Sequence, residues 1–337
     1  MIKIVRTDAE LEVPRVDAAL RERGTLVLLP STTDEARFSR ELRDADLLLM
    51  CYAQVSAHAI ANAERLRGIV KYGVGIDAID IEAAKRRRIP VVNVPEYAEE
   101  TVAEGAMALI LALARKFKPL QREMQLRGWA WPTASWLASD LAGKTLGLVG
   151  VGKIGARVAR MAGQGFRMSV MGFDPYVSRS DMLQKGVEKC DELHEMLVRS
   201  DVVSVHAVLT AETRHLLGER QLAAMKTGAI VVNVSRGAII DEEALVRALQ
   251  SARIAGAALD VYTDEPLALS GHPLSPLYGM DNVLLWPHLT FYTAEAMQRL
   301  EDDTLERCAE MLEGRPVLVK SRDPRLRSQR FGVRFVD

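Results

Sequence analysis

The sequence has few cysteines and little charge imbalance. Its three cysteines, Cys51, Cys190 and Cys308, form no CxxC pair, and an odd number fits no disulfide framework. We therefore expect reduced thiols and a cytoplasmic protein. Lys and Arg number 44 against 45 Asp and Glu, so no basic field indicates a nucleic-acid partner. The one local bias, the basic segment from Lys320 to Arg334, is interpreted as a solvated tail.

Long apolar runs are also missing. The longest, Ala106–Ala114, has nine residues, whereas a bilayer span needs about 20. We expect no membrane segment and interpret this run as a buried helix. The first residues enter a strand-like run with an early charge, which is not the pattern of a signal peptide. The histidines from position 194 to 288 show no HxxxH or HxH spacing, so we predict no metal site.

Short apolar runs alternate with amphipathic segments along most of the chain. This alternation is typical of βαβ units, and hence of parallel sheets covered on both faces. The first set of expected strands begins at Ile2, Thr25, Ala45, Gly68 and Pro90. The second set begins at Thr145, Met168, Val202, Ala229, Ala255 and Asn282. The six strands of the second set match the doubly wound dinucleotide-binding fold.

The chain is longer than one hydrophobic core usually supports, which favours two domains. We predict an α/β protein with two doubly wound parallel-sheet domains, a flavodoxin-like one and a Rossmann one, joined by two helices. Residues 1–98 and 292–337 are assigned to the first domain, and residues 99–291 to a second domain inserted in it. The joining helices are expected at about Ala98–Arg127, broken near Pro119, and at about Ala294–Glu313.

A glycine-rich loop opens the second domain. The stretch "TLGLVGVGKIGARVARMA" places Gly150, Gly152 and Gly155 in a G-x-G-x-x-G pattern between an apolar strand and a helix. In that context the first glycine permits a tight turn, the second lets the backbone approach a pyrophosphate, and the third lets helix and strand pack closely. The amides near Lys153 and Ile154 would then face phosphate from a helix N-terminus.

An acidic residue follows at the expected distance. Asp174 ends the next strand, nineteen residues after Gly155, and is expected to accept hydrogen bonds from the adenosine ribose. Its charge would repel a 2′-phosphate, and the nearest arginines, Arg167 and Arg179, do not occupy that strand end. We therefore predict NAD and disfavour NADP. The structural alternative is a group of turn glycines and a turn Asp before Pro175.

Three later strands end on polar residues. "VVNVSRG" carries Arg236, "ALDVYTDEP" carries Asp260 and Glu265, and "LLWPH" carries His288. Ligands of open α/β sheets bind beyond the carboxyl ends of the strands. Hydride transfer to a carbonyl needs a proton donor, which His288 can be, with Glu265 orienting its ring and Arg236 binding a carboxylate. Alternatively, each residue alone has a structural role, as a surface or capping Arg, a loop charge and a hydrogen-bonded core His.

With these motifs the chain resembles the D-isomer-specific 2-hydroxyacid dehydrogenases, the family of phosphoglycerate dehydrogenase, glyoxylate/hydroxypyruvate reductase and D-lactate dehydrogenase. The resemblance covers essentially the whole chain. It is carried by "KYGVGIDAIDIEAAKRRRIPVVNVPEYAEETVAEGAMALILALAR", "LAGKTLGLVGVGKIG", "VHAVLTAETRHLL" and "LAAMKTGAIVVNVSRGAIIDEEALVRAL".

The resemblance implies that the first domain binds substrate and the second binds NAD. It implies that Arg236, Glu265 and His288 are catalytic and that the amides of Val74 and Gly75 hold the substrate carboxylate. Beyond the glycines, it implies NAD contacts from Lys153, Ile154, Asp174, His206, Ala207, Thr213, Val234, Ser235, Asp260, His288 and Val102. It also implies a homodimer built on the first joining helix and the tryptophan-rich loop 128–144. Trp136 is our candidate for reaching the partner's active site, with packing in the dimer interface as the alternative.

Several departures from the family pattern bear on the substrate. Where small residues commonly follow the His, "PHLTFYT" has Thr290, Phe291 and Tyr292, which should reshape the pocket or the nicotinamide contact. The loop "CYAQVS" lacks the Arg that helps phosphoglycerate dehydrogenases to bind phosphate, and the 21 residues after Pro316 are too few for their regulatory domain. We therefore expect a small unphosphorylated 2-oxo acid, with Tyr52 and Tyr292 shaping its pocket.

Three other functions stay open. Phosphoglycerate dehydrogenase would be favoured by a basic side chain that reaches the pocket from elsewhere in the chain. An NAD-gated corepressor of the same family could keep the Arg–Glu–His set without turnover. A different reaction on the same scaffold, such as formate or phosphite oxidation, cannot be judged from the fold alone.

Overall fold

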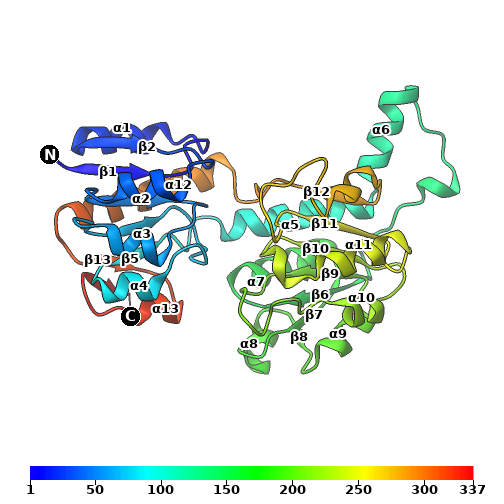
Figure 1. Ribbon diagram of the computed structural model, residues 1–337. Coiled ribbons are helices and arrows are strands. Elements are labelled where there is room, and N and C mark those ends of the chain that lie inside the picture. Colours follow the sequence, from blue (N-terminus) through cyan, green and yellow to red (C-terminus); the bar gives the residue numbers. More distant parts are fainter. Residues whose placement is uncertain (337) are drawn as a thin grey trace. The chain divides into compact units, whose positions relative to one another are not determined.

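The computed structural model of the protein describes residues 1–336. The chain forms two compact units. Unit 1 comprises Met1–Ala98 and the chain from Thr293 onwards, and unit 2 comprises Glu99–Tyr292. Each unit is a parallel sheet with helices on both faces (Figure 1). The predicted fold class is confirmed.

Unit 1 contains a five-stranded parallel sheet with the order β2-β1-β3-β4-β5. All five strands expected from the apolar runs are present, and this order is that of flavodoxin-like folds. The strands are β1 (Lys3–Arg6), β2 (Thr25–Leu28), β3 (Leu47–Met50), β4 (Ile69–Lys71) and β5 (Val91–Asn93). The helices are α1 (Pro14–Arg23), α2 (Glu35–Leu42), α3 (Ala57–Asn62), α4 (Ile81–Arg86), α12 (Ala294–Leu312) and α13 (Pro324–Arg327).

The basic segment near the C-terminus is folded, which corrects its interpretation as a solvated tail. β13 (Val317–Val319) and β14 (Val333–Phe335) pair in parallel on either side of α13. Leu326 is completely buried. The side-chain amide of Gln329 accepts a hydrogen bond of 2.7 Å from the backbone N–H of Val91 and donates one of 2.9 Å to the carbonyl of Val91. The charged side chains obscure this anchoring in the sequence, because between Lys320 and Arg334 only Ser321, Leu326 and Gln329 are buried.

Unit 2 contains a seven-stranded parallel sheet with the order β12-β11-β10-β9-β6-β7-β8. Six of its strands are the predicted ones, and the run β8-β7-β6-β9-β10-β11 has the 3-2-1-4-5-6 order of the dinucleotide-binding fold. The strands are β6 (Thr145–Val149), β7 (Ser169–Phe173), β8 (Glu188–Lys189), β9 (Val202–Val205), β10 (Ile230–Asn233), β11 (Gly256–Leu259) and β12 (Val283–Leu285). Sequence analysis missed β8, because this edge strand has two charged residues and no apolar pattern.

The helices of unit 2 lie on the two faces of this sheet, except α6, which projects away from it (Figure 1). They are α5 (Glu99–Ala114), α6 (Phe117–Arg127), α7 (Lys153–Arg160), α8 (Arg179–Gln184), α9 (Leu193–Arg199), α10 (Glu219–Ala224) and α11 (Glu242–Gln250). Short 3-10 or π segments occur at Ala134–Trp136, Met161–Gly165, Gly237–Ile239 and Ser275–Gly279.

The first joining helix is broken close to the expected position. Lys116 has a φ of 54°, which ends α5, and Pro119 stands in the first turn of α6. A proline is tolerated in the first turn because its missing amide hydrogen would have no helical partner there. The segment is thus divided near Pro119, as expected, and the break itself is at Lys116. No helix within residues 1–336 is long and apolar enough to cross a bilayer.

Candidate active site

Three neighbouring strands of unit 2 end in the same register. Leu259 of β11 is paired with Asn233 of β10 on one side and with Leu285 of β12 on the other. Arg236 lies three residues beyond the end of β10, Asp260 directly follows β11, and His288 lies three residues beyond β12. Because the strands are parallel and adjacent, their following residues gather at one edge of the sheet.

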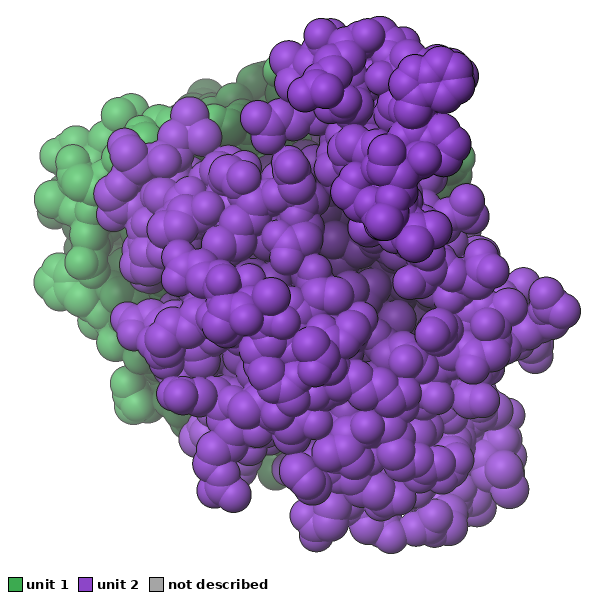
Figure 2. All heavy atoms as spheres, turned by 90° about the vertical axis from the view of Figure 1, so that its right-hand side faces the viewer, with its two compact units in different colours: residues 1–98, 293–337 green, residues 99–292 purple. Residues whose placement is uncertain are grey.

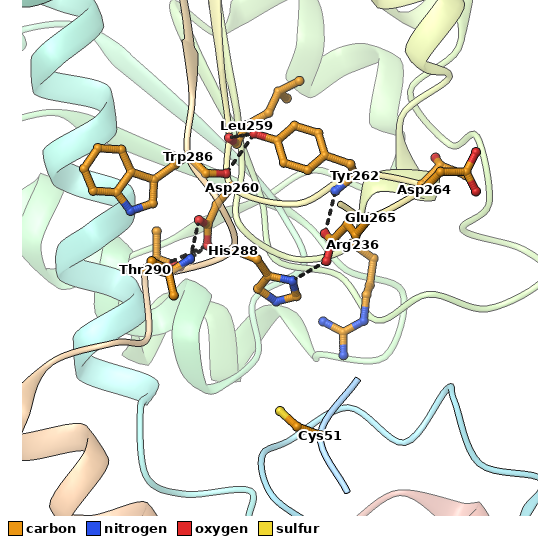
Figure 3. A network of polar contacts seen from close by, with 12 residues as sticks. Cys51, Arg236, Leu259, Asp260, Tyr262, Asp264, Glu265, Trp286, His288 and Thr290 are labelled. Carbon is orange, nitrogen blue, oxygen red and sulfur yellow. Dashed lines mark hydrogen bonds and ion pairs between the residues drawn. The ribbon is translucent and has the colours of Figure 1, made fainter. Parts of the chain in front are cut away.

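His288 and Glu265 are hydrogen bonded to each other. The distance from Nδ1 of His288 to Oε2 of Glu265 is 2.9 Å, and each side chain is 30% exposed (Figure 3). The other carboxylate oxygen of Glu265 accepts a hydrogen bond from the backbone amide of Tyr262 at 2.9 Å. Because the carboxylate holds Nδ1, proton transfer by this ring would use Nε2.

Tyr262 ties the Glu265 loop to the sheet. Its hydroxyl donates to the carbonyl of Leu259, at the end of β11, and to the carbonyl of Trp286, just beyond β12, at 2.9 and 2.8 Å. The side chain is 7% exposed. The residue whose amide holds the Glu265 carboxylate is thus itself anchored to two of the three strands.

The Glu265 carboxyl is held in its ionised form. Partial burial acts to raise its pKa, but hydrogen bonding to His288, the charge of His288, the Tyr262 amide and the charge of Arg236 together lower it below the usual value. A carboxylate of this kind favours the protonated imidazole of its partner. The pair therefore has the chemistry of an oriented proton donor and acceptor.

Arg236 approaches this pair because a glycine follows it. A Cβ atom on Gly237 would lie 2.0 Å from the backbone carbon of Tyr262 and 2.2 Å from the nitrogen of Thr263. Only a glycine lets the loop after β10 pack against the loop that carries Glu265. The Arg236 guanidinium donates to the Ser235 carbonyl at 2.7 Å, and the side chain points to the same side as the His288 ring (Figure 3).

Asp260 holds the turn in which His288 lies. It is 1% exposed, and its two oxygens accept hydrogen bonds from the amides of Leu289 and Thr290 and from the hydroxyl of Thr290. Burial raises the pKa of Asp260, and these hydrogen bonds together with the charge of His288 oppose that rise. His288 has a left-handed backbone, with a φ of 57°. That conformation costs roughly 1–2 kcal/mol in a residue other than glycine.

The glycine loop has the geometry that a dinucleotide requires. Gly150 has a φ of 94°, and a Cβ there would lie 2.7 Å from the nitrogen of Ala207. A Cβ on Gly155 would lie 2.4 Å from the carbonyl oxygen of Gly150, so the helix–strand contact needs that glycine. At Gly152, where α7 begins, a Cβ would face open space. This opening is where a phosphate can approach the backbone.

Asp174 braces this loop. One carboxylate oxygen accepts a hydrogen bond from the amide of Val151 and the other from the amide of Tyr176, both at 2.9 Å.

His206 directly follows β9. Its Nε2 is hydrogen bonded to the hydroxyl of Ser204 at 2.8 Å, and burial lowers the pKa of His206 to about 4. Within residues 1–336, the buried Nδ1 of His206 has no partner. A neutral ring with an unused nitrogen fits a polar group of a bound cofactor.

The remaining expected cofactor residues are placed around the same sheet edge. Val102 of α5 and Val234, just after β10, are each 8% exposed. The hydroxyl of Ser235 donates to the carbonyl of Ala207. The hydroxyl of Thr213 donates to the carbonyl of Val208 at 2.6 Å and therefore shapes its own loop. Lys153 forms an ion pair with Glu99 at 3.0 Å.

The expected substrate residues Tyr52, Val74 and Gly75 belong to unit 1, whereas Tyr292 is the last residue of unit 2. Asp8 accepts hydrogen bonds from the amides of Cys51 and Tyr52 and so fixes the loop after β3. The carbonyl of Val74 accepts a hydrogen bond of 2.6 Å from Asn93. The Tyr52 and Val74 side chains are 42% and 46% exposed.

Sequence analysis missed Lys71, at the end of β4. This lysine is 7% exposed, and its ammonium group contacts the carbonyl of Cys51 and lies 5.5 Å from the centre of the Tyr52 ring. Among residues 1–336, no carboxylate lies within ion-pairing distance of it. A lone lysine inside the apolar run "GIVKYG" is the signal that could have identified it.

Comparison with known proteins relates most of the chain to one family. Residues 107–290 match the family model described as "D-isomer specific 2-hydroxyacid dehydrogenase, NAD binding domain". The D-3-phosphoglycerate dehydrogenase of Methanocaldococcus jannaschii is 38% identical over 93% of this chain and 58% of its own length. The glyoxylate reductase of Korarchaeum cryptofilum is 39% identical over 81% of this chain and 83% of its own length.

Solved structures agree with these relatives. The structure of D-lactate dehydrogenase from Aquifex aeolicus, complexed with NAD and lactic acid, has a TM-score of 0.83 and 31% identity over 92% of this chain and 96% of its own. The similarity to the phosphoglycerate dehydrogenases covers little more than half of their length. The predicted family and the predicted cofactor, NAD, are confirmed at this level.

The Glu265–His288 pair gives a prediction about stability and pH. In Glu265→Gln the amide can accept only one of the two hydrogen bonds, so the free energy of unfolding should fall by about 1 kcal/mol at pH 7. Because the folded pKa of Glu265 is lowered, its contribution is present above the unfolded pKa of about 4.3 and is lost as pH falls through the folded pKa. Urea unfolding of both proteins between about pH 2.5 and 7 should therefore show a difference that is constant near neutral pH and shrinks below about pH 4.3. A constant difference over this range would contradict the ion-pair assignment.

Proposed function

Since the chain belongs to the D-isomer specific 2-hydroxyacid dehydrogenase family, we propose that it transfers hydride between NAD(H) and C2 of a small 2-hydroxy or 2-oxo acid. The observation that carries this proposal is the His288–Glu265 hydrogen bond of 2.9 Å beside Arg236, at the carboxyl ends of β10, β11 and β12. These three side chains supply the proton, its orientation and a fixed positive charge at one sheet edge.

The proposed chemistry assigns one task to each side chain. When bound, the nicotinamide supplies the hydride to C2 in reduction and accepts it in oxidation. Protonated His288 gives its Nε2 proton to the carbonyl oxygen as the alcohol forms, and it takes that proton back in oxidation. Glu265 holds Nδ1 and stabilises the imidazolium. Arg236 binds the substrate carboxylate, a task suited to its planar fork of donors.

The NAD-binding residues are proposed from the geometry of the glycine loop. The open space at Gly152 and the start of α7 would receive the pyrophosphate, and Asp174 would meet the adenosine ribose. Both carboxylate oxygens of Asp174 already accept backbone amides, but each can accept a second hydrogen bond. Its negative charge favours NAD over NADP.

The first test is the oxidation of NADH, followed at 340 nm, with a panel of 2-oxo acids. Glyoxylate, hydroxypyruvate, pyruvate, branched and aromatic 2-oxo acids, and phosphohydroxypyruvate are compared, with NADPH in parallel. We expect strong turnover of one unphosphorylated acid, and a loss of about 100-fold to 10,000-fold in kcat for His288→Ala.

The control for this variant is NADH binding, measured by fluorescence, which should be unchanged. Retained turnover in His288→Ala would mean that another group donates the proton. If NADH binds to the wild-type protein but no acid is reduced, the evidence would favour an NAD-gated binding protein or an unusual substrate instead.

A phosphorylated substrate is the second candidate, and Lys71 favours it. The loop after β3 lacks a basic residue, but the Lys71 ammonium lies against that loop, beside Tyr52. A buried ammonium without a carboxylate partner is suited to an anionic group. D-3-phosphoglycerate dehydrogenases are among the similar proteins. The substrate of this candidate is 3-phosphohydroxypyruvate or its alcohol.

Replacing Lys71 separates the two candidates. If the phosphate binds at Lys71, Lys71→Met should lower kcat/KM for phosphohydroxypyruvate by about 10- to 100-fold, with hydroxypyruvate little affected, because a charged hydrogen bond contributes about 1.5–3 kcal/mol. The matched control is Lys85→Met, which removes a lysine on α4 whose ammonium pairs with Glu82. Equal losses for both acids would show that Lys71 only supports the loop.

We propose further that two copies of the chain associate through α6 and the loop after it. Every residue of α6 is at least partly exposed. Together, α6 and the loop expose Phe117, Met124, Leu126, Trp129, Trp131 and Leu137, each between 41% and 75%. Such an apolar surface is rarely left in contact with water. In Figure 1 this segment stands away from the sheet of unit 2.

A groove of about 670 Å³ lies beside this segment in unit 2, along the amino-terminal ends of β9 to β12. Figure 2 looks onto this face, which is hollowed below the projecting segment. Trp136 is partly buried and lines the groove of its own chain. This placement favours its role in the interface, whereas Trp129 and Trp131 are 59% and 75% exposed.

Sedimentation equilibrium tests the dimer. The wild-type protein should sediment at twice the chain mass of 37.2 kDa, and Leu126→Glu combined with Trp131→Glu should sediment as a monomer, because burying two new charges opposes association. Leu269→Glu is the control, since Leu269 is 78% exposed elsewhere in unit 2. A wild-type monomer, or equal effects of both changes, would contradict this interface.

The compartment proposed for the protein is the cytoplasm. Cys51, Cys190 and Cys308 are all free and buried. Burial raises the pKa of the Cys190 thiol to about 11 and that of Cys308 to about 12, which keeps both in the unreactive form. Free thiols are typical of a reducing compartment.

A further inference from the structure

The turn after His288 contains a buried hydroxyl to which the proposed reaction assigns no task. Thr290 is 9% exposed, and its hydroxyl donates to Oδ2 of Asp260 at 2.5 Å. Its amide donates to the same oxygen at 3.1 Å, and the amide of Leu289 donates to Oδ1 at 2.8 Å. The hydroxyl is the only one of these three donors that a side chain supplies, so it is the one that the sequence can add or remove.

Space for this threonine is provided by a glycine in α5. A Cβ atom on Gly105 would lie 2.8 Å from Cβ and 3.0 Å from Cγ2 of Thr290. Contacts below 3.0 Å between such atoms are essentially never tolerated, so Thr290 fills the volume that Gly105 leaves free. The two residues are therefore matched in size across the contact between α5 and the turn.

The same turn fixes the imidazole of His288 from two sides. His288 has a left-handed φ of 57°, which the hydrogen bonds of the next two residues to Asp260 hold in place. The ring of Phe291 meets the His288 ring edge-on, with centroids 6.4 Å apart and an interplanar angle of 86°. A loss of the Asp260 contact would free both the backbone and the ring.

We propose that Thr290 is a positioning residue for His288. Its hydroxyl anchors the turn to Asp260 and keeps the imidazole oriented towards Glu265. Gly105, which lacks a side chain, leaves the room that the Thr290 side chain occupies. The inference rests on the proposed function, in which Nε2 of His288 gives its proton to the carbonyl oxygen. Proton transfer is sensitive to small displacements of the donor, so a loosened turn lowers the rate without changing cofactor binding.

The activity test compares Thr290→Val with Thr290→Ser. Valine keeps the shape but lacks the hydroxyl, and we expect kcat to fall by about 10- to 100-fold while the Kd for NADH stays within about twofold. Serine keeps the hydroxyl and should retain kcat within about threefold of the wild type. Equal losses in both variants would show that packing against Gly105, and not the hydrogen bond, is what matters.

A double-mutant cycle tests the match with Gly105. Gly105→Ala should lower kcat by about tenfold when Thr290 is present, because its new Cβ displaces the threonine. In a Thr290→Gly background the same change should have little further effect, since the clash is gone. Additive losses would mean that the two residues act independently, which would contradict the proposed match.

A measurement without turnover separates this inference from the proposed function. Ring ¹⁵N NMR reports the Nδ1 hydrogen bond of each histidine, and His288→Asn assigns the His288 signal. We expect the wild type and Thr290→Ser to give one sharp signal and Thr290→Val to give a shifted or broadened one. If the wild-type protein reduces no 2-oxo acid, the proposed function fails. The His288 signal then still decides whether Thr290 positions the imidazole. An unchanged signal in both Thr290→Val and Thr290→Ala would overturn the positioning role.

Discussion

The common register of β10, β11 and β12 is the constraint on which the candidate site depends. Asn233, Leu259 and Leu285 are neighbours across the sheet, so the residues after them start from the same edge. Short connections then suffice to bring Arg236, Glu265 and His288 together. A shift of one residue in one strand would turn its side chains to the opposite face and would separate the group. Gly237 adds to this constraint, because any side chain there would push apart the loops after β10 and β11.

Much of this arrangement could be predicted because it depends on repeating patterns. Apolar runs of strand length identified all five strands of the first sheet and six of the seven in the second. The polar residues that follow such runs had to lie at the carboxyl edge of a parallel sheet, which indicated Arg236, Glu265 and His288 before any distance was known. Features that depend on single contacts could not be predicted from the sequence. β8 and the anchoring of Gln329 leave no periodic pattern in the sequence.

Two buried charges show where sequence reasoning reaches its limit. Asp260 is 1% exposed, but three hydrogen bonds from Leu289 and Thr290 satisfy its oxygens. Lys71 is 7% exposed, and its ammonium has carbonyl oxygens and an aromatic ring as neighbours. Burial of an ion without an opposite charge costs several kcal/mol. The Asp260 carboxylate is therefore satisfied within its own turn, whereas the Lys71 ammonium is held by carbonyl oxygens and the Tyr52 ring without a carboxylate partner among residues 1–336.

The free energies of strain and hydrogen bonding in the His288 turn also indicate that the turn holds His288 in a fixed position. A left-handed histidine costs roughly 1–2 kcal/mol, and a hydrogen bond to a charged group contributes about 1.5–3 kcal/mol. The two backbone amides alone can offset the strain. The hydroxyl of Thr290 is then a surplus whose effect is to narrow the range of turn conformations. A smaller residue at position 290 would leave a gap against Gly105. The side chain thus restricts the motion of the one group that has to present a proton at a fixed point.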